Sequence, residues 1–252
     1  MKVQSIDRTF DLIELLSFEP NGLALTAIAQ KVDLPISTVF RLLSNLVERG
    51  YVEKRDSGIY KIGLKFIEIS ALFLNRLELK TEAHPILVEL TKRVGFVSFM
   101  AINIEDHVCY TDRVDTSDTL RSYSYIGQRR SLFSTGLGKS LLLRWEKDSL
   151  EKFILEHELT RRTHNTITDR KFLLKELEES RKRGWTYDNE EDQLGFRCIA
   201  APVRDYRKEV IAAISVSWAL EYFDEVDEEK VASAVVHAAT EISKRLGCIW
   251  TS

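Results

Sequence analysis

The residues most suited to chemistry lie in three segments of the second half of the chain. The first runs from Ser134 to Ser140 and reads STGLGKS. Its spacing resembles a phosphate-binding P-loop, but that motif requires a glycine where this chain has Phe133. What remains is a glycine-containing turn at Gly136 that opens a helix. The free N–H groups of such a turn can hold a small anion such as a carboxylate.

The second and third segments could supply side chains to the same ligand. Asp188 follows Gly184 and precedes Cys198 in a run that mixes aromatic and acidic residues. Ser215 and Ser217 alternate with apolar residues in ISVSW, so a strand would place both hydroxyls on one face. Hydroxyls on an otherwise apolar strand need hydrogen-bond partners, and a bound ligand would provide them.

Each of these features also has an ordinary structural interpretation. Gly136 can be only a turn, Asp188 a cap or a surface charge, and the paired serines can lie on an exposed sheet face. Cys198 can be a small buried apolar residue. An enzyme with Cys198 as nucleophile beside Asp188 is a further alternative. It has no neighbouring histidine in the sequence, so folding would have to bring His164 or His107 close.

Composition and charge indicate a globular protein with one large domain or two ordinary ones. The chain has 252 residues, of which 44% are hydrophobic and 30% charged, and its formal net charge is -3. The three cysteines form no CxxC pair and the five histidines have no ligand spacing, so we expect no disulfide framework, metal or cofactor. The chain shows no signal peptide and no apolar run of about 18 residues, which predicts a cytoplasmic protein without a membrane span.

Residues 25–52 have the pattern of a helix-turn-helix. Apolar residues recur at helical spacing as far as residue 32, and Pro35 suits the first turn of a second helix that Gly50 ends. A polar face on a second helix of this kind can enter the major groove of DNA. The alternative is an ordinary helical hairpin in a protein core. The residues on the outer face are Ser37, Thr38, Arg41, Asn45 and Glu48.

A first helix and a hairpin complete a predicted winged helix-turn-helix domain over residues 1–62. Residues 3–18 have helical spacing, and residues 51–54 and 59–62 are typical of two strands joined by a tight turn. Lys54 and Arg55 lie near the tip, where they could contact phosphates or the minor groove; the alternative is a solvated basic tip. Residues 1–80 hold 11 Lys+Arg and 10 Asp+Glu, so DNA contacts must come from local clusters.

Residues 63–78 and 79–252 are predicted to form a linker helix and a second, α+β domain with a largely antiparallel sheet. The linker carries a broad apolar stripe that includes Leu64 and Ile67, which we interpret as a dimerisation surface. The alternative is packing against the chain's own second domain. The predicted helices span 79–94, 135–145, 148–159, 169–184 and 224–245. The predicted strands span 96–104, 108–114, 120–126, 198–203 and 210–218.

Over nearly its whole length the sequence resembles the IclR family of bacterial transcription regulators. The matching N-terminal motifs are Ser5-Ile6-Asp7-Arg8, Leu25-Thr26-x-Ile28-Ala29, Ser37-Thr38-Val39-x-Arg41-Leu42-Leu43, Gly50-Tyr51-Val52 and Tyr60-Lys61-Ile62-Gly63. The matching C-terminal motifs are Ser134-Thr135-Gly136-x-Gly138-Lys139, Asn165-Thr166-Ile167-Thr168, Gly184-x-x-x-Asp188-x-x-Glu191 and Cys198-Ile199-Ala200-x-x-Val203. One position departs: the family usually has an aromatic residue or histidine before Asp205, and this chain has Arg204.

The resemblance implies a winged helix-turn-helix, a linker helix and a GAF-like effector-binding domain. It also implies homodimers or dimers of dimers, and effectors that are small carboxylates, sugar acids or aromatic acids. The stretch from Leu120 to Arg130 is similar to regulators of sugar-acid catabolism such as ketodeoxygluconate regulators. The implied effector pocket uses the amides of Gly136 and Leu137 and the side chains of Asp188, Cys198, Ser215 and Ser217.

The resulting hypothesis is a ligand-responsive repressor of a catabolic operon that binds a palindromic double-stranded operator. Arg41 is the strongest candidate for base reading because its guanidinium can pair with O6 and N7 of a guanine together. Ser37, Thr38 and Asn45 would also face the groove, with Lys54 and Arg55 on phosphates. The alternatives are the enzyme described above and a sensor or scaffold that binds no DNA.

Overall fold

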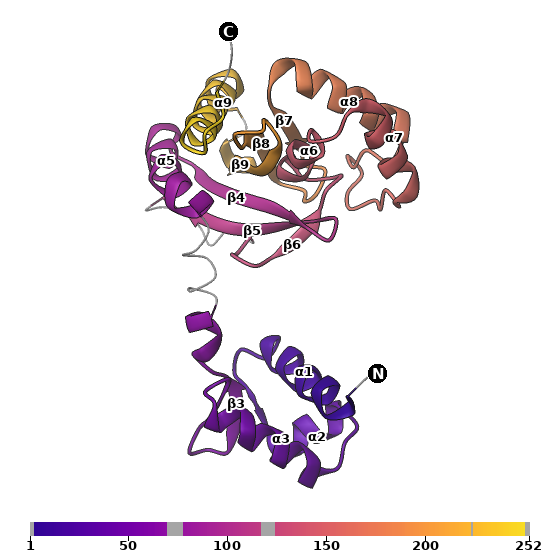
Figure 1. Cartoon of the computed structure of the whole chain (residues 1–252), viewed down its shortest axis with the longest axis vertical. Helices are drawn as coiled ribbons and strands as arrows, with labels where there is room; N and C mark the ends of the chain where they lie inside the picture. The colour runs from indigo at the N-terminus through magenta and orange to yellow at the C-terminus, as the bar shows by residue number, and fades with distance from the viewer. Residues whose placement is uncertain (1–2, 70–77, 117–123, 223, 250–252) are drawn as a thin grey trace. The chain divides into compact units, whose positions relative to one another are not determined.

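The computed structural model describes residues 3–69, 78–116, 124–222 and 224–249. The chain divides into two compact units, Met1–Arg76 and Leu77–Ser252 (Figure 1). Both units combine helices with antiparallel strands, so the predicted α+β class is confirmed.

The first unit is a helix-turn-helix with a small sheet. Its helices are α1 (Gln4–Ser17), α2 (Leu25–Lys31) and α3 (Ile36–Glu48). Its strands, in the order β1-β3-β2, are β1 (Leu23–Ala24), β3 (Ile59–Ile62) and β2 (Val52–Lys54). Strand β1 was not predicted, because two residues are too few to show a period of two. Pro35 caps α3 from the position just before the helix and is not in its first turn. The core residues are Leu12, Leu16, Ile28, Ala29, Val39, Leu43, Leu46, Val52 and Tyr60.

The segment that follows the wing contacts the residues after α3 mainly through backbone atoms. A Cβ on Gly63 would lie 2.2 Å from the carbonyl oxygen of Gly50, so the two chain segments approach as only glycine permits. The N–H of Gly63 donates to the carbonyl of Tyr51 at 2.8 Å, and the N–H of Lys65 donates to Gly50 at 3.2 Å. The Phe66 ring meets Tyr51 edge-on. Residues 65–69 are helical, and residues 70–77 of the predicted linker helix lie outside the described part.

The second unit contains a six-stranded sheet in which every neighbouring pair is antiparallel. In spatial order its strands are β6 (Arg129–Ser131), β5 (His107–Val114), β4 (Val97–Ile104), β9 (Val210–Ala219), β8 (Phe196–Arg204) and β7 (Thr186–Asn189). The short strands β6 and β7 were not predicted. The strand predicted over 120–126 is wrong for residues 124–126, which form no strand, and its residues 120–123 lie outside the described part.

Helices cover both faces of this sheet (Figure 1). Helices α5 (Glu78–Val94) and α9 (Glu228–Arg245) pack on one face, with Pro85 inside α5. Helix α6 (Gly136–Leu142) packs on the other face, followed by α7 (Lys147–Glu156) and α8 (Arg170–Arg183). A 3-10 turn, η1 (Leu220–Tyr222), follows β9. The predicted N-cap of α9 at Asp224 is wrong, because Asp227 caps the helix by accepting from the N–H of Lys230.

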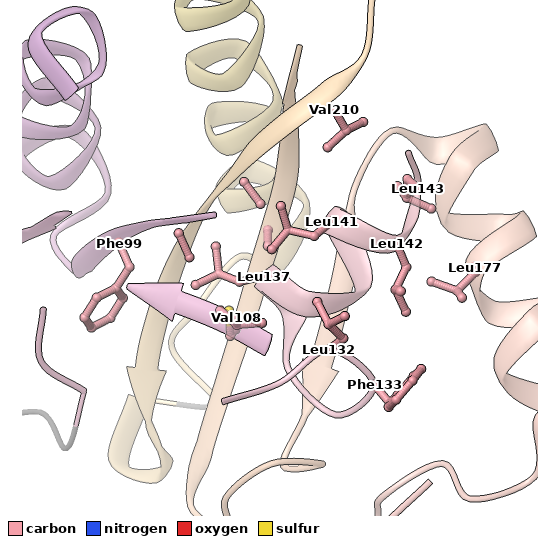
Figure 2. Close-up of a cluster of buried hydrophobic side chains, with 14 of the residues drawn as sticks. Phe99, Val108, Leu132, Phe133, Leu137, Leu141, Leu142, Leu143, Leu177 and Val210 are labelled. Carbon is pink, nitrogen blue, oxygen red and sulfur yellow. The ribbon is translucent and has the colours of Figure 1, made fainter. Parts of the chain in front are cut away.

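Helix α6 is buried along its whole length. Leu137 and Leu141 point toward the sheet, and Leu142 lies toward Leu177 of α8 (Figure 2). The chain just before α6 passes so close to Gly138 that a Cβ there would lie 2.5 Å from the carbonyl oxygen of Leu132. Glycine at this position therefore permits the packing of α6.

Replacing Gly138 by alanine should lower the free energy of unfolding by about 1–3 kcal/mol, because backbone must move to relieve the contact. Urea denaturation of the full chain measures the loss. Lys171→Ala, at an exposed site on α8, is the control and should change stability by less than about 0.5 kcal/mol. If Gly138→Ala left the unfolding midpoint unchanged, the backbone before α6 would be able to move away without a cost in stability.

Candidate functional sites

Hydrogen-bonded register brings the predicted polar residues of the second unit into one row. Asp188 on β7 pairs with Cys198 on β8, and Cys198 pairs with Ser217 on β9. The next row on the same face contains Ser215. Because the side chains of alternate residues share a face, this face is the one that α6 covers.

A cavity of about 1460 Å³ opens at this end of the sheet. Four of the six predicted effector residues line it: Leu137, Asp188, Cys198 and Ser217. The cavity also has aromatic walls and polar residues from other segments. The aromatic walls include Phe96, Phe99, Tyr110 and Trp218, and the polar residues include Arg130, Thr135 and Asp192.

The other two predicted effector residues, Gly136 and Ser215, do not line the cavity. A Cβ on Gly136 would lie 3.0 Å from the sulfur of Cys198, so this glycine packs against the sheet. Its carbonyl accepts a hydrogen bond from the hydroxyl of Thr186 at 2.7 Å. Ser215 is fully buried, and no described residue hydrogen-bonds its hydroxyl. Both residues therefore lie behind the wall that a ligand would touch.

Two carboxyls beneath the cavity have different partners. The Nζ of Lys139 lies 2.5 Å from Oε1 of Glu191, and both side chains are buried. No described cation forms an ion pair with Asp188, whose Oδ1 accepts the N–H of Glu191 at 2.8 Å. Burial raises the pKa of Asp188 to about 8, although Lys139 opposes the shift, so near pH 7 this carboxyl carries a proton and can donate.

The thiol of Cys198 is unsuited to nucleophilic chemistry. Burial, and after it the nearby Asp188, raise its pKa to about 12, so near pH 7 the thiolate is scarce. No histidine is found among the described residues that line the cavity. The two histidines that the enzyme alternative invoked, His107 and His164, are both exposed.

Sequence reasoning did not identify Tyr110, Arg130 and Asp192 as cavity residues. They come from β5, β6 and the segment after β7, and β6 had not been predicted as a strand. Arg130 had been noted only as the end of a stretch similar to sugar-acid regulators. Their residue types have no spacing in common, so only the register of the sheet brings them together.

The polar outer face of α3 is present in the first unit. Ser37, Arg41 and Asn45 are exposed and Thr38 is half-buried. The side-chain amide of Asn45 donates to the carbonyl of Arg41 at 3.0 Å, so part of its hydrogen-bonding capacity is already used. Sequence reasoning overlooked Phe40, which is an exposed apolar residue on α3.

The wing presents its two predicted basic residues. Lys54 ends β2 and lies 5.6 Å from the centre of the Tyr60 ring, while Arg55 follows in the turn. Both are exposed. Within the described part of the chain, no carboxylate forms an ion pair with Arg41, Lys54 or Arg55. These three cations are therefore available to an external anion.

Comparison with known proteins decides what this architecture is. Residues 71–244 match the bacterial transcriptional regulator IclR C-terminal domain, and residues 5–56 match the IclR helix-turn-helix domain. The chain belongs to the IclR family. The chain is thus a DNA-binding transcriptional regulator with an effector-binding C-terminal domain, and it is not an enzyme. The alternatives of an enzyme and of a scaffold that binds no DNA are wrong.

Individual relatives span almost the whole of this IclR-family chain. The HTH-type transcriptional regulator BhcR of Paracoccus denitrificans (strain Pd 1222) is 34% identical over 242 residues, 96% of this chain and 86% of that protein. The transcriptional repressor IclR of Escherichia coli (strain K12) is 31% identical over 249 residues, 98% of this chain and 91% of that protein. The crystal structure of the Thermotoga maritima IclR matches with a TM-score of 0.88 at 30% identity, covering 97% of this chain and 99% of that one.

Among the described residues, no helix is long and apolar enough to cross a membrane.

The raised pKa of Asp188 predicts how stability depends on pH. The folded chain holds this proton more tightly than the unfolded chain, so the stabilisation is present at low pH and is lost as pH rises toward about 8. Asp188→Asn, which cannot ionise, should therefore gain stability relative to the native chain between pH 5 and pH 8, by on the order of a few kcal/mol. Urea denaturation at the two pH values measures this. Glu179→Gln on the exposed face of α8 is the control, and parallel pH curves for Asp188→Asn and the native chain would contradict the buried, protonated carboxyl.

Proposed function

We propose that this regulator represses a catabolic operon and that a small carboxylate or sugar acid, bound in the cavity of the second unit, changes its affinity for DNA. The observation that carries the proposal is the row Asp188–Cys198–Ser217, which meets a cavity with apolar walls. The row offers a hydroxyl and a protonated carboxyl, both suited to the oxygens of a polar acid. The repressor name of the E. coli relative supports the sign of regulation.

The residues proposed to contact this acid are those predicted from the sequence, in two roles. Leu137, Asp188, Cys198 and Ser217 reach the cavity and would touch the acid directly. Gly136 and Ser215 would support them from behind the cavity wall. The amide N–H groups of Gly136 and Leu137 begin α6, and no described residue accepts a hydrogen bond from either.

For DNA we propose base reading by α3 and phosphate contacts by the wing. Arg41 would form paired hydrogen bonds with a guanine, while Ser37, Thr38 and Asn45 would contact the groove beside it. Lys54 and Arg55 would bind phosphates, since both are exposed and have no ion pair with a described residue. With a balance of only +1 over residues 1–80, these few cations must supply most of the attraction.

We further propose that two chains form a homodimer, able to pair into a dimer of dimers, on a palindromic operator. The proposed division is residues 1–62 for DNA, 63–78 for a linker helix and 79–252 for the effector. In the described part of the linker, Leu64 is 72% exposed and Ile67 is 65% exposed, which supports a role in dimerisation. A dimer would double the small number of cations presented to one operator.

The effector acts only through its different affinities for the two states of the regulator, which limits the effect on DNA binding to about 1–3 kcal/mol for typical coupling. Repression requires that the acid bind better to the state with low DNA affinity. The cavity lies entirely within the second unit, so the acid would influence the operator through the dimer and not by touching DNA.

The DNA contacts are tested by Arg41→Ala and Lys54→Ala in gel-shift assays with the protein's own upstream region and a set of single-base variants. Arg41→Ala should lose about 1–3 kcal/mol on the native site and tolerate change at one operator position. Lys54→Ala should weaken binding to every sequence alike and reduce the salt dependence. If Arg41→Ala lost the same affinity on every base variant, Arg41 would contact the DNA backbone and not a base.

The effector site is tested by a thermal-shift screen of sugar acids and keto acids, followed by operator binding with the acid that stabilises the native chain most. Ser217→Ala and Asp188→Ala should abolish the influence of that acid on operator binding, while binding without the acid persists. Ser233→Ala, at an exposed serine of α9 that does not line this cavity, is the matched control. A native response in both cavity variants would place the effector elsewhere.

A further inference from the structure

One arginine reaches the cavity beside the predicted row of residues. Arg130 lies on the edge strand β6, and its side chain is only 13% exposed. Its Nη1 donates to Oδ2 of Asp192 at 2.7 Å. The same aspartate accepts from the hydroxyl of Ser134 at 2.8 Å, and its Oδ1 lies 3.4 Å from Nε of Arg162. One buried carboxylate thus faces two guanidinium groups.

The charges around the floor of the cavity therefore do not cancel. Arg130 and Arg162 share the single negative charge of Asp192, so one positive charge is left over. The neighbouring Lys139 and Glu191 balance each other. Asp188 adds no charge near pH 7, because burial keeps its carboxyl protonated. Arg162 is 47% exposed, so water solvates much of its charge, whereas Arg130 is only 13% exposed and shares its one carboxylate. A bound anion would complete the neutralisation of Arg130.

Other acidic residues line the cavity away from this cluster. Asp115 forms an ion pair with Arg113. Glu221 and Glu225 belong to the segment that follows β9, and Lys92 of α5 lines the cavity with them. None of these carboxylates forms an ion pair with Arg130 among the described residues. Arg130 therefore lines the cavity close to Asp188, and its one described ion-pair partner, Asp192, is shared with Arg162.

The guanidinium of Arg130 is held in place with donors to spare. With the amide of Gln128 turned so that its oxygen faces Arg130, that oxygen lies 3.1 Å from both Nε and Nη2. Asp192 and Gln128 then engage three of the five N–H groups of the arginine. The remaining two, one on Nη1 and one on Nη2, can donate to a carboxylate. The hydroxyl of Tyr110 also lines the cavity, and burial raises its pKa, so it stays a donor.

We propose that Arg130 is the residue that pairs with the acid group of the effector, and that Asp192 positions its guanidinium for this contact. The inference rests on the proposed function in requiring an acidic effector, and it makes the requirement specific. The effector carries a carboxylate for Arg130 and, in the same small molecule, a hydroxyl or keto oxygen for Asp188 and Ser217. Uncharged sugars and amines are excluded.

The test compares the full native chain with Arg130→Gln, Arg130→Lys and the control Arg129→Gln. Arg129 is the neighbouring arginine on β6, which pairs with Glu105 and does not line the cavity. The probes are pyruvate, 2-keto-3-deoxygluconate and benzoate, each beside its uncharged methyl ester, measured by thermal shift and calorimetric titration. The acid that binds the native chain should bind Arg130→Gln at least about tenfold more weakly, and this variant should no longer distinguish the acid from its ester.

The control and the conservative variant complete the test. Arg129→Gln should bind the acid as the native chain does. Arg130→Lys keeps the charge but not the guanidinium, so it should bind the acid several-fold more weakly than the native chain and still prefer it to the ester. This variant decides the matter if Arg130→Gln unfolds on its own.

Three results would overturn the inference. Native affinity for the acid in Arg130→Gln would show that another group pairs with it, while acid sensing itself would stand. Native affinity in Arg130→Lys would show that the guanidinium is not required. If no acid stabilises the native chain, the proposed function fails and this inference fails with it.

Discussion

The second unit depends on one buried ion pair. Lys139 on α6 and Glu191 in the segment after β7 meet at 2.5 Å, and the lysine has no exposed surface. Removing two charges from water costs several kcal/mol for each ion, so such a pair persists only when both partners stay in place. Because Glu191 also donates its N–H to Asp188, the pair fixes α6, the end of β7 and the floor of the cavity relative to one another.

This arrangement assigns different tasks to acidic residues that are close in sequence. Glu191 forms an ion pair with Lys139 and has a structural role. Asp188 has no ion pair with a described residue, carries a proton near pH 7 and lines the cavity. Asp192, the next residue, carries one negative charge and forms ion pairs with two arginines, Arg130 and Arg162. Three of the four carboxyls from residue 188 to residue 192 thus supply a neutral donor, a buried ion pair and a carboxylate that faces two arginines. This arrangement suits the proposed acid with a hydroxyl or keto oxygen.

The longer elements could be predicted from sequence because their apolar period is long enough to read, as for α1, α3, β4 and β9. The strands β1, β6 and β7 are two to four residues long and show no period. The shared face of Ser215 and Ser217 was predictable from strand alternation, but which of them reaches the cavity was not, because α6 covers one and leaves the other open. Arg130 required the register of a strand that the sequence did not reveal.

The contact between Gly50 and Gly63 has a mechanical consequence. Residues 63–66 are tied to the end of α3 by backbone hydrogen bonds and by one aromatic pair, with no side chain between the two glycines. A rotation of residues 63–66 would therefore act on the end of α3 through backbone contacts and not through a layer of side chains. The close approach depends on the missing Cβ of Gly63, since a Cβ on Gly50 would lie 3.8 Å from the Cβ of Lys65.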